Sequence, residues 1–280
     1  MATAMPASGI LHTLNNSARS RSVWLIRGAA TDGSQPLVTD LRGLIELLGG
    51  TADMQALGGN EQFAVHRVPR GTTLVHEGAQ ARTLYIVQSG SFKSVKTAED
   101  GYEHVLGFAW RRDLIGYDGL YREHYAFAAV ALEDSRVIAL PLASLAQLRQ
   151  RSATFDAALQ ALIARQLAHA GEIAEVMAAV AADVRLARFL VQLSARMAER
   201  GQSPRRLLLR MNRRDIANHL GLAHETISRS FRMLSEGGWL RVDNREVEIL
   251  DLPGLKQCAR STRGVADDAL APRGAMACAA

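Results

Sequence analysis

The order of apolar and polar residues changes in the middle of the chain. Between Phe63 and Leu140, apolar residues occur in short alternating runs, separated by glycine-containing turns at intervals of roughly 8 to 12 residues. The runs that we expect to form strands are Thr73–Val75, Leu84–Val87, Phe92–Val95, His104–Phe108 and Arg136–Leu140. Several short strands at this spacing predict an all-β barrel or sandwich.

A helical pattern follows Pro141 and continues to Arg200 without another proline. Inside it, eight positions recur at alternating intervals of four and three residues, the period of a two-stranded coiled coil. These positions are Leu159, Ile163, Gln166, Ala170, Ile173, Met177, Val180 and Val184. Because none of them is charged, the stripe predicts a homodimer joined along one long helix. A long helix that packs only against its own barrel is the alternative.

Residues 212–234 have the pattern of two short helices joined by a tight turn. Gly221 permits the turn, and Ile227 and Phe231 give the second helix a buried stripe. Two strand-like runs around a polar turn come next, Trp239–Val242 and Glu246–Leu250. This order predicts a winged helix-turn-helix, an element that places its second helix in the major groove of DNA.

The second helix of this motif carries side chains that suit the edges of base pairs. Arg229 can bind guanine O6 and N7 together, Glu225 can accept from a cytosine amino group, and Ser228 can contact several bases. The residues expected to contact phosphates are Arg213, His224, Thr226 and Arg232.

Composition supports two globular domains with different charges. The 280 residues are 48% hydrophobic and 22% charged, and their formal net charge is +5. Residues 185–260 hold 15 lysines and arginines against 8 acidic residues, whereas the rest of the chain holds 18 against 20. The positive charge therefore belongs to the C-terminal module, as expected for a reader of double-stranded DNA.

Several other classes of protein are disfavoured by the sequence. Cys258 and Cys278 are too few for a disulfide framework, a zinc site or an iron–sulfur cluster. No apolar stretch is long enough to cross a membrane and no signal peptide is apparent, so we expect a cytoplasmic protein. A cupin-like β-barrel enzyme is the rival from another class, but the chain has no His-x-His, phosphate loop or nucleophile elbow.

Residues 60–256 resemble the Crp/Fnr superfamily of bacterial transcription regulators. The likeness rests on His224–Arg229, Leu186–Gly201 and Ala131–Glu133, and His224–Arg229 is similar to the recognition helix of the Fnr branch. The resemblance implies an α+β fold: an N-terminal cyclic-nucleotide-binding-like β jelly-roll barrel, a long dimerisation helix and a C-terminal winged helix-turn-helix. It also implies a homodimer on a palindrome of TTGAT-type half-sites, contact with RNA polymerase, and transcription activation.

The expected organisation has five parts. They are an N-terminal arm at 1–58 with a short helix at Leu41–Leu48, a sensor-like barrel at 59–145, a dimerisation helix at 146–184, the winged helix-turn-helix at 185–258 and a disordered tail at 259–280.

The sequence departs from the resembling family where signals are sensed. Gly116-Tyr117 and Phe127-Ala128 stand where cyclic-nucleotide-binding relatives hold the ribose and the phosphate, so we expect no binding of cyclic AMP in the usual way. Ile138 replaces the barrel cysteine, and the first 257 residues contain no cysteine, which argues against a four-iron cluster.

Two possibilities for the signal stay open. One is a regulator with no effector, as in FixK-like members of the superfamily. The other is a regulator that responds to haem or nitric oxide, for which the candidate axial ligands are His66, His76, His104 and His124.

Overall fold

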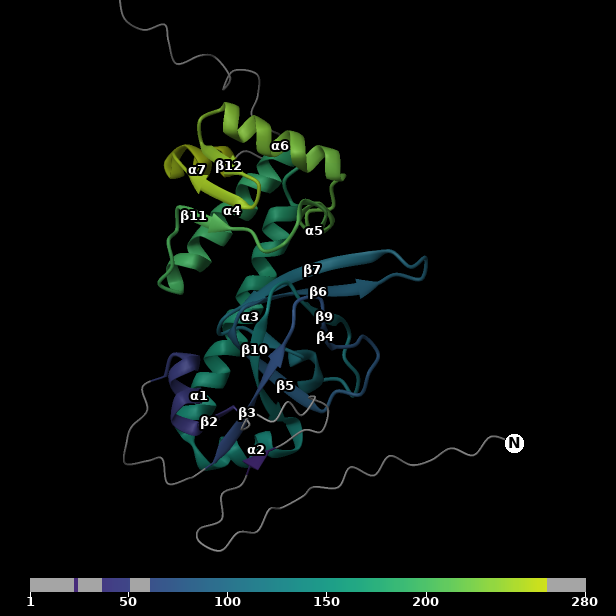
Figure 1. The fold of residues 1–280 in the computed structure, drawn as a ribbon, viewed down its shortest axis with the longest axis vertical. Coiled ribbons are helices and arrows are strands. Elements are labelled where there is room, and N and C mark those ends of the chain that lie inside the picture. The colour runs from purple at the N-terminus through teal and green to yellow at the C-terminus, as the bar shows by residue number, and fades with distance from the viewer. Residues whose placement is uncertain (1–22, 25–36, 51–60, 261–280) are drawn as a thin grey trace, which may run out of the picture.

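The computed structural model describes residues 23–24, 37–50 and 61–260 (Figure 1). Of the tail expected to be disordered at 259–280, Ala259 and Arg260 instead belong to the last helix, and the rest of the tail and most of the N-terminal arm lie outside the described residues. A barrel of β-strands forms one half of the molecule, and the helices and small sheet of the C-terminal half lie at the other end of a long helix (Figure 1).

The barrel consists of two sheets, and the expected strands are all present. One sheet has the order β1-β3-β10-β5-β8 with β2 paired to β3, and the other has the order β4-β9-β6-β7. The strands are β1 (Val23–Trp24), β2 (Val38–Asp40), β3 (Gln62–Val68), β4 (Thr73–Val75), β5 (Thr83–Ser89), β6 (Ser91–Thr97), β7 (Glu103–Trp110), β8 (Leu114–Ile115), β9 (Ala128–Ala131) and β10 (Ser135–Pro141). Val87, Phe92 and Val137 fill the space between the sheets.

One glycine shows why the turn residues in this barrel are restricted. Gly90 alone separates β5 from β6 and has φ +88°, a conformation that L side chains rarely adopt. A Cβ at this position would also lie 2.1 Å from Ser135 Oγ. Only glycine therefore fits this corner, which brings β6 directly after β5.

Four helices surround or follow the barrel: α1 (Leu41–Leu48), α2 (Leu142–Arg151), α3 (Ala153–Met177) and α4 (Ala182–Glu199). A short 3₁₀ helix, η1 (Tyr117–Leu120), follows β8. The expected helix at 41–48 is confirmed, and its Leu44 and Ile45 are buried together with Phe155 and Leu159 of α3. Helices α1, α2 and α3 share this buried cluster with Phe63 of β3, Ile86 of β5 and Ile138 of β10, so these three helices cover one face of the β3–β10–β5 sheet.

The single helix expected at 146–184 is wrong in its extent. Ser152 has an extended backbone and its Oγ accepts a hydrogen bond from Phe155 N at 3.1 Å, so α3 begins there as a new helix. At the other end α3 stops at Met177, and α4 turns back along it. Arg185 holds this bend, because its Nε donates to Ala179 O at 2.7 Å and its Nη1 to Leu220 O at 3.1 Å.

The coiled-coil stripe is consequently not continuous. Leu159 is 1% exposed and packs against the protein's own barrel, while Val184 is fully buried in α4. Val180 lies in the connection between the helices and is 74% exposed. Gln166 donates to Leu114 O at 3.2 Å, which also turns it toward the barrel.

The C-terminal half confirms the winged helix-turn-helix. Its elements are β11 (Arg206–Leu208), α5 (Arg213–His219), α6 (His224–Glu236), β12 (Leu240–Asp243), β13 (Glu246–Ile249) and α7 (Leu252–Arg260). The wing sheet has the order β11-β13-β12; β11 and α7 were not expected from the sequence. Gly221, in the turn between α5 and α6, has φ +63°.

A single apolar core joins the two halves. Val105 and Phe108 of β7 belong to the same buried cluster as Phe189 and Leu190 of α4 and Ile216 of α5. No helix in the described part of the chain is long and apolar enough to cross a membrane.

Candidate nucleic-acid interface

Helix α6 buries one face and leaves the other free for DNA. Ile227, Phe231 and Leu234 are buried, as the sequence predicts, whereas Glu225 and Arg229 are exposed. Helix α5 lies between α6 and the barrel, so the exposed face of α6 points away from the rest of the chain (Figure 1). An exposed polar face on a helix at the outer surface is suited to enter a major groove.

The three predicted base-contacting residues lie together on this face, at helical spacings of three and one residues. Arg229 Nη2 donates only a long hydrogen bond of 3.3 Å, to Thr226 Oγ1. Ser228 Oγ donates to His224 O at 3.1 Å, and Glu225 lies in the first turn of the helix. Because these side chains are exposed and weakly held, they can reorient toward base edges at little cost.

The N-terminus of α6 is a suitable place for a phosphate. Ala223 occupies the cap position and offers no side-chain acceptor to the first-turn amides. Two of the predicted phosphate-contacting residues, His224 and Thr226, lie in this first turn. Arg232 follows on the exposed face and makes only a loose pair with Glu236, at 3.7 Å between Nε and Oε1.

Arg213 differs from the other predicted phosphate contacts because it is engaged within the protein. Its guanidinium carbon lies 3.6 Å from the centre of the Phe231 ring, and its Nη2 donates to Asn244 O of the wing turn at 3.0 Å. Burial lowers the pKa of Arg213. Arg213 therefore ties α5 to α6 and to the wing, and its contact with DNA stays a prediction.

The basic residues beside the motif are partly paired with carboxylates. Arg210 Nε lies 3.0 Å from Glu133 Oε2 of the barrel, and Arg241 Nη1 lies 2.7 Å from Glu248 Oε2. The side chain of Arg206 is 82% exposed, and its Nε lies 3.9 Å from Glu248 Oε1, which makes this the longest of the three ion pairs. Arg206 is thus the freest cation of this group for a DNA backbone.

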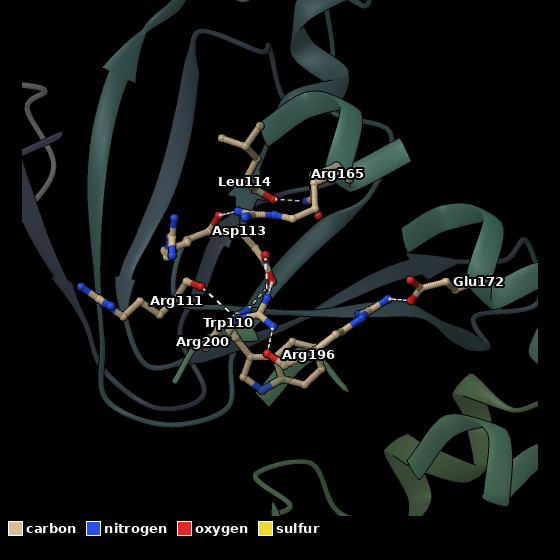
Figure 2. Close-up of polar contacts among 10 residues, drawn as sticks. Trp110, Arg111, Asp113, Leu114, Arg165, Glu172, Arg196 and Arg200 are labelled. Atoms are coloured by element: carbon tan, nitrogen blue, oxygen red, sulfur yellow. Dashed lines mark hydrogen bonds and ion pairs between the residues drawn. The ribbon is translucent and has the colours of Figure 1, made fainter. Parts of the chain in front are cut away.

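A network of arginines fixes α3 and α4 to the end of β7 (Figure 2). Arg200 Nη2 lies 2.9 Å from both carboxylate oxygens of Asp113, and the two side chains are 8% and 2% exposed. Asp113 also accepts from Trp110 N at 2.9 Å. Arg196 pairs with Glu172 of α3 at 3.0 Å, and the guanidinium carbons of Arg196 and Arg200 lie over the Trp110 ring at 6.0 and 5.7 Å from its centre. The bend between α3 and α4 is therefore held by buried charge as well as by packing.

The region that would hold an effector contains a cavity of about 120 Å³ between β7, α3 and α4. Tyr117 and Phe127 line it, with ring centres 5.7 Å apart. Within the described residues, Arg196 is the one basic residue of the lining apart from histidines, and its Nη2 is already paired with Glu172. Aromatic rings, Tyr117 and Phe127, thus lie at two of the positions for which the resemblance implies contacts to ribose and phosphate.

The four histidines considered as axial ligands do not converge. His76, His104 and His124 are exposed, and His66 on β3 is half-buried, with a pKa lowered by burial. Within residues 23–24, 37–50 and 61–260, no group of three or more histidine, cysteine or acidic side chains is placed to hold a metal ion.

Sequence reasoning missed two other histidines. His169 of α3 and His219 of α5 both line the cavity, and desolvation lowers the pKa of each. His219 lies edge-on to the rings of Phe108 and Phe189, at 5.0 and 5.7 Å between ring centres. Nothing in the local sequence could reveal this, because the partners come from β7 and α4.

Comparisons with known proteins agree with this architecture. Residues 65–152 match the cyclic nucleotide-binding domain and residues 184–258 match the Crp-like helix-turn-helix domain. The chain is 35% identical over 191 residues to the transcriptional regulatory protein btr of Bordetella pertussis, covering 68% of this chain and 79% of that protein. It is also 35% identical over 199 residues to the fumarate and nitrate reduction regulatory protein of Escherichia coli K12, covering 71% and 80%.

Among solved structures, FixK2 from Bradyrhizobium japonicum shares the fold, with a TM-score of 0.63 and 24% identity over 73% of this chain and 98% of that one. The fold and the exposed recognition helix define a DNA-binding transcription regulator that carries a cyclic-nucleotide-binding β-domain. On the strength of its relatives, the chain belongs to the Crp/Fnr family.

Proposed function

We propose that this chain acts as a homodimeric, sequence-specific regulator that reads a palindrome of TTGAT-type half-sites. One observation carries the proposal: Glu225, Ser228 and Arg229 form an exposed polar face on a helix whose opposite face is fully buried. The arginine supplies a fork for guanine, the glutamate an acceptor for cytosine, and the serine a small adaptable partner. These are the residue types that the resemblance implied for the half-site.

An exposed stripe on α3 supports the homodimer. It contains three of the expected seam residues, Ile163, Ala170 and Met177, and adds Leu167 and Ala174, so that its members lie at intervals of four, three, four and three. Ile163, Leu167 and Met177 are 38%, 75% and 39% exposed, which is unusual for large apolar side chains on one helix face. A second copy of α3 would cover this stripe by coiled-coil packing.

We infer that cyclic AMP and a four-iron cluster do not control this regulator. Among the described residues that line the cavity, the one guanidinium is that of Arg196, which is already paired with Glu172. A cyclic phosphate beside Phe127 would therefore lack a free cation, and burying it would cost several kcal/mol by order of magnitude. Cys258 is buried on α7 and burial raises the pKa of its thiol to about 11, which opposes the thiolate that iron ligation needs. A haem- or nitric-oxide-responsive regulator is the second candidate that the test below separates.

We also propose that the protein acts in the bacterial cytoplasm, where it contacts RNA polymerase and activates transcription. Similarity to the fumarate and nitrate reduction regulatory protein supports a role in transcription. Addition of the purified protein to a reconstituted transcription reaction with a selected palindrome upstream of a promoter should raise transcript yield.

The deciding experiment selects bound duplexes from a random library with the purified full-length protein. We expect two inverted TTGAT-type elements, and binding that does not change when cyclic AMP is added. A duplex in which one element is scrambled is the matched control. Enrichment of a single unpaired element, or of no sequence, would contradict the proposal.

Absorption spectra of protein purified from its native host distinguish the second candidate. A Soret band, together with DNA binding that is lost when the haem is removed, would favour a haem-responsive regulator over an effector-free one.

A further inference from the structure

The first helix of the DNA-binding motif is attached to the free edge of a barrel strand. Strand β7 ends the order β4-β9-β6-β7, so its outer backbone groups have no neighbouring strand in the described part of the sheet. Val105 N donates to Asn218 Oδ1 at 2.7 Å, and Asn218 Nδ2 donates to Glu103 O. The ring Nδ1 of His219 lies 3.1 Å from Val105 O. Two adjacent side chains of α5 thus pair with β7 as another strand would.

An ion pair adds to this attachment at the opposite end of α5. Lys93 Nζ of β6 lies 2.8 Å from Asp215 Oδ1, and these side chains are only 20% and 10% exposed. The other oxygen of Asp215 accepts from Asn212 N at 3.1 Å, while Asn212 Oδ1 accepts from Asp215 N at 2.7 Å. The same carboxylate therefore caps α5 and links its first turn to the barrel.

We propose that Asn218 and Lys93 are positioning residues, which hold the helix-turn-helix in one orientation on the barrel. We call these interactions the α5–barrel contact: Lys93 with Asp215, and Glu103 and Val105 with Asn218 and His219. The recognition face of α6 lies on the far side of α5 from this contact (Figure 1). The contact fixes where that face points without touching DNA itself.

The benefit of a fixed orientation depends on the palindrome, so this inference rests on the proposed function. A dimer must place two recognition helices about one helical turn of DNA apart, roughly 34 Å. If each helix-turn-helix moved freely on its barrel, binding of both half-sites would have to restrict that motion, and affinity would fall. Binding of a single half-site requires no fixed distance between the two helices.

This difference gives a test in which a positioning role and a folding defect have distinct results. The variants are Asn218→Ala and Lys93→Met, with Lys96→Met as the matched control, since Lys96 is exposed on the same strand and forms no ion pair within the described residues. Lys93→Arg keeps the charge and should retain wild-type behaviour. Affinity is measured for the full palindrome and for a duplex with one half-site scrambled.

For Asn218→Ala and Lys93→Met we expect about a tenfold loss of affinity for the palindrome and less than about a twofold change for the single half-site. Hydrogen exchange provides a readout independent of DNA. The Val105 amide should exchange at least about tenfold faster in Asn218→Ala, because its hydrogen-bond acceptor is gone, while Lys96→Met should leave it unchanged.

The failures are distinguishable. A wild-type protein that binds the palindrome no better than a half-site overturns the proposed function. A wild-type preference for the palindrome that both variants retain overturns the positioning role alone. Equal losses on both duplexes would also overturn it, because they indicate a folding defect or a direct DNA contact.

Discussion

Replacing Arg229 with alanine should impair DNA reading while leaving the protein stable. Arg229 is exposed, and the one internal hydrogen bond of its side chain in the described structure is the 3.3 Å interaction with Thr226. Loss of such a contact should change the free energy of unfolding by less than about 0.5 kcal/mol. A bidentate arginine–guanine pair contributes about 1 to 3 kcal/mol of discrimination, and a palindrome contains two copies. The proposed dimer should therefore lose about 2 kcal/mol or more of binding energy, roughly 30-fold in affinity.

Arg213→Ala is the matched comparison, because this arginine is held inside the motif. Losing its stacking on Phe231 and its 3.0 Å hydrogen bond to Asn244 O should lower the free energy of unfolding by about 1 to 2 kcal/mol. Any phosphate contact that it makes would weaken all DNA sequences alike and reduce the dependence of binding on salt.

Fluorescence anisotropy with a palindromic and a scrambled duplex at several salt concentrations measures both effects, and thermal unfolding measures stability. Arg229→Ala should lose affinity for the palindrome only. If it weakens both duplexes by the same factor, or unfolds as early as Arg213→Ala, then Arg229 does not read a base.

Three further predictions concern stability and assembly. Asp113→Asn should lower the free energy of unfolding in urea by about 3 to 5 kcal/mol, because Arg200, 8% exposed, loses its counter-charge. Leu167→Asp should convert the dimer to a monomer in sedimentation, since it places like charges across the proposed α3 seam. Burial lowers the pKa of His169 and His219, so the unfolded state binds more protons below about pH 6.5. Thermal scans should therefore show stability falling on acidification, by up to about 1.4 kcal/mol per pH unit for each histidine.

The first two of these predictions have a control on the surface. Glu46→Gln breaks the exposed ion pair with Arg42 and should lower the free energy of unfolding by less than about 0.5 kcal/mol. If Asp113→Asn lowers the free energy of unfolding by no more than Glu46→Gln does, then the ion pair between Arg200 and Asp113 does not stabilise the protein as we expect. Leu250→Asp, at an exposed apolar residue outside α3, should leave the dimer intact. A stability that stays constant between about pH 7 and pH 5.5 would contradict the assignment of buried neutral histidines.

The strands and the helix-turn-helix could be predicted because local rules determine them. Each expected strand had a short apolar run bounded by a turn residue, and Gly90 and Gly221 do adopt backbone angles that favour glycine. The recognition face could be predicted from the spacing of Ile227 and Phe231. These two residues mark the buried side of α6, so the opposite side must be exposed.

The extent of the central helix and the full membership of its exposed stripe could not be predicted, because distant partners determine them. Residues 178–182 are mostly alanine, which favours helix, yet the chain bends there and Arg185 binds the carbonyl of Ala179. Period alone does not distinguish a stripe that packs on the barrel, such as the one containing Leu159, from the exposed stripe containing Leu167. Likewise Lys93 and Asp215 are separated by more than a hundred residues.

The contacts that orient the DNA-binding half bear on whether an effector is needed. Arg200 with Asp113 holds the end of α4, and Asn218 with Val105 holds α5, so the helix-turn-helix is anchored to the barrel at two separate points. Neither point includes Gly116-Tyr117 or Phe127-Ala128, the positions at which the resemblance implies contacts to a nucleotide. If the proposed function is correct, a protein whose own side chains fix its recognition helices can bind the palindrome without first binding a ligand. The strength of the α5–barrel contact is then the quantity on which operator affinity should depend.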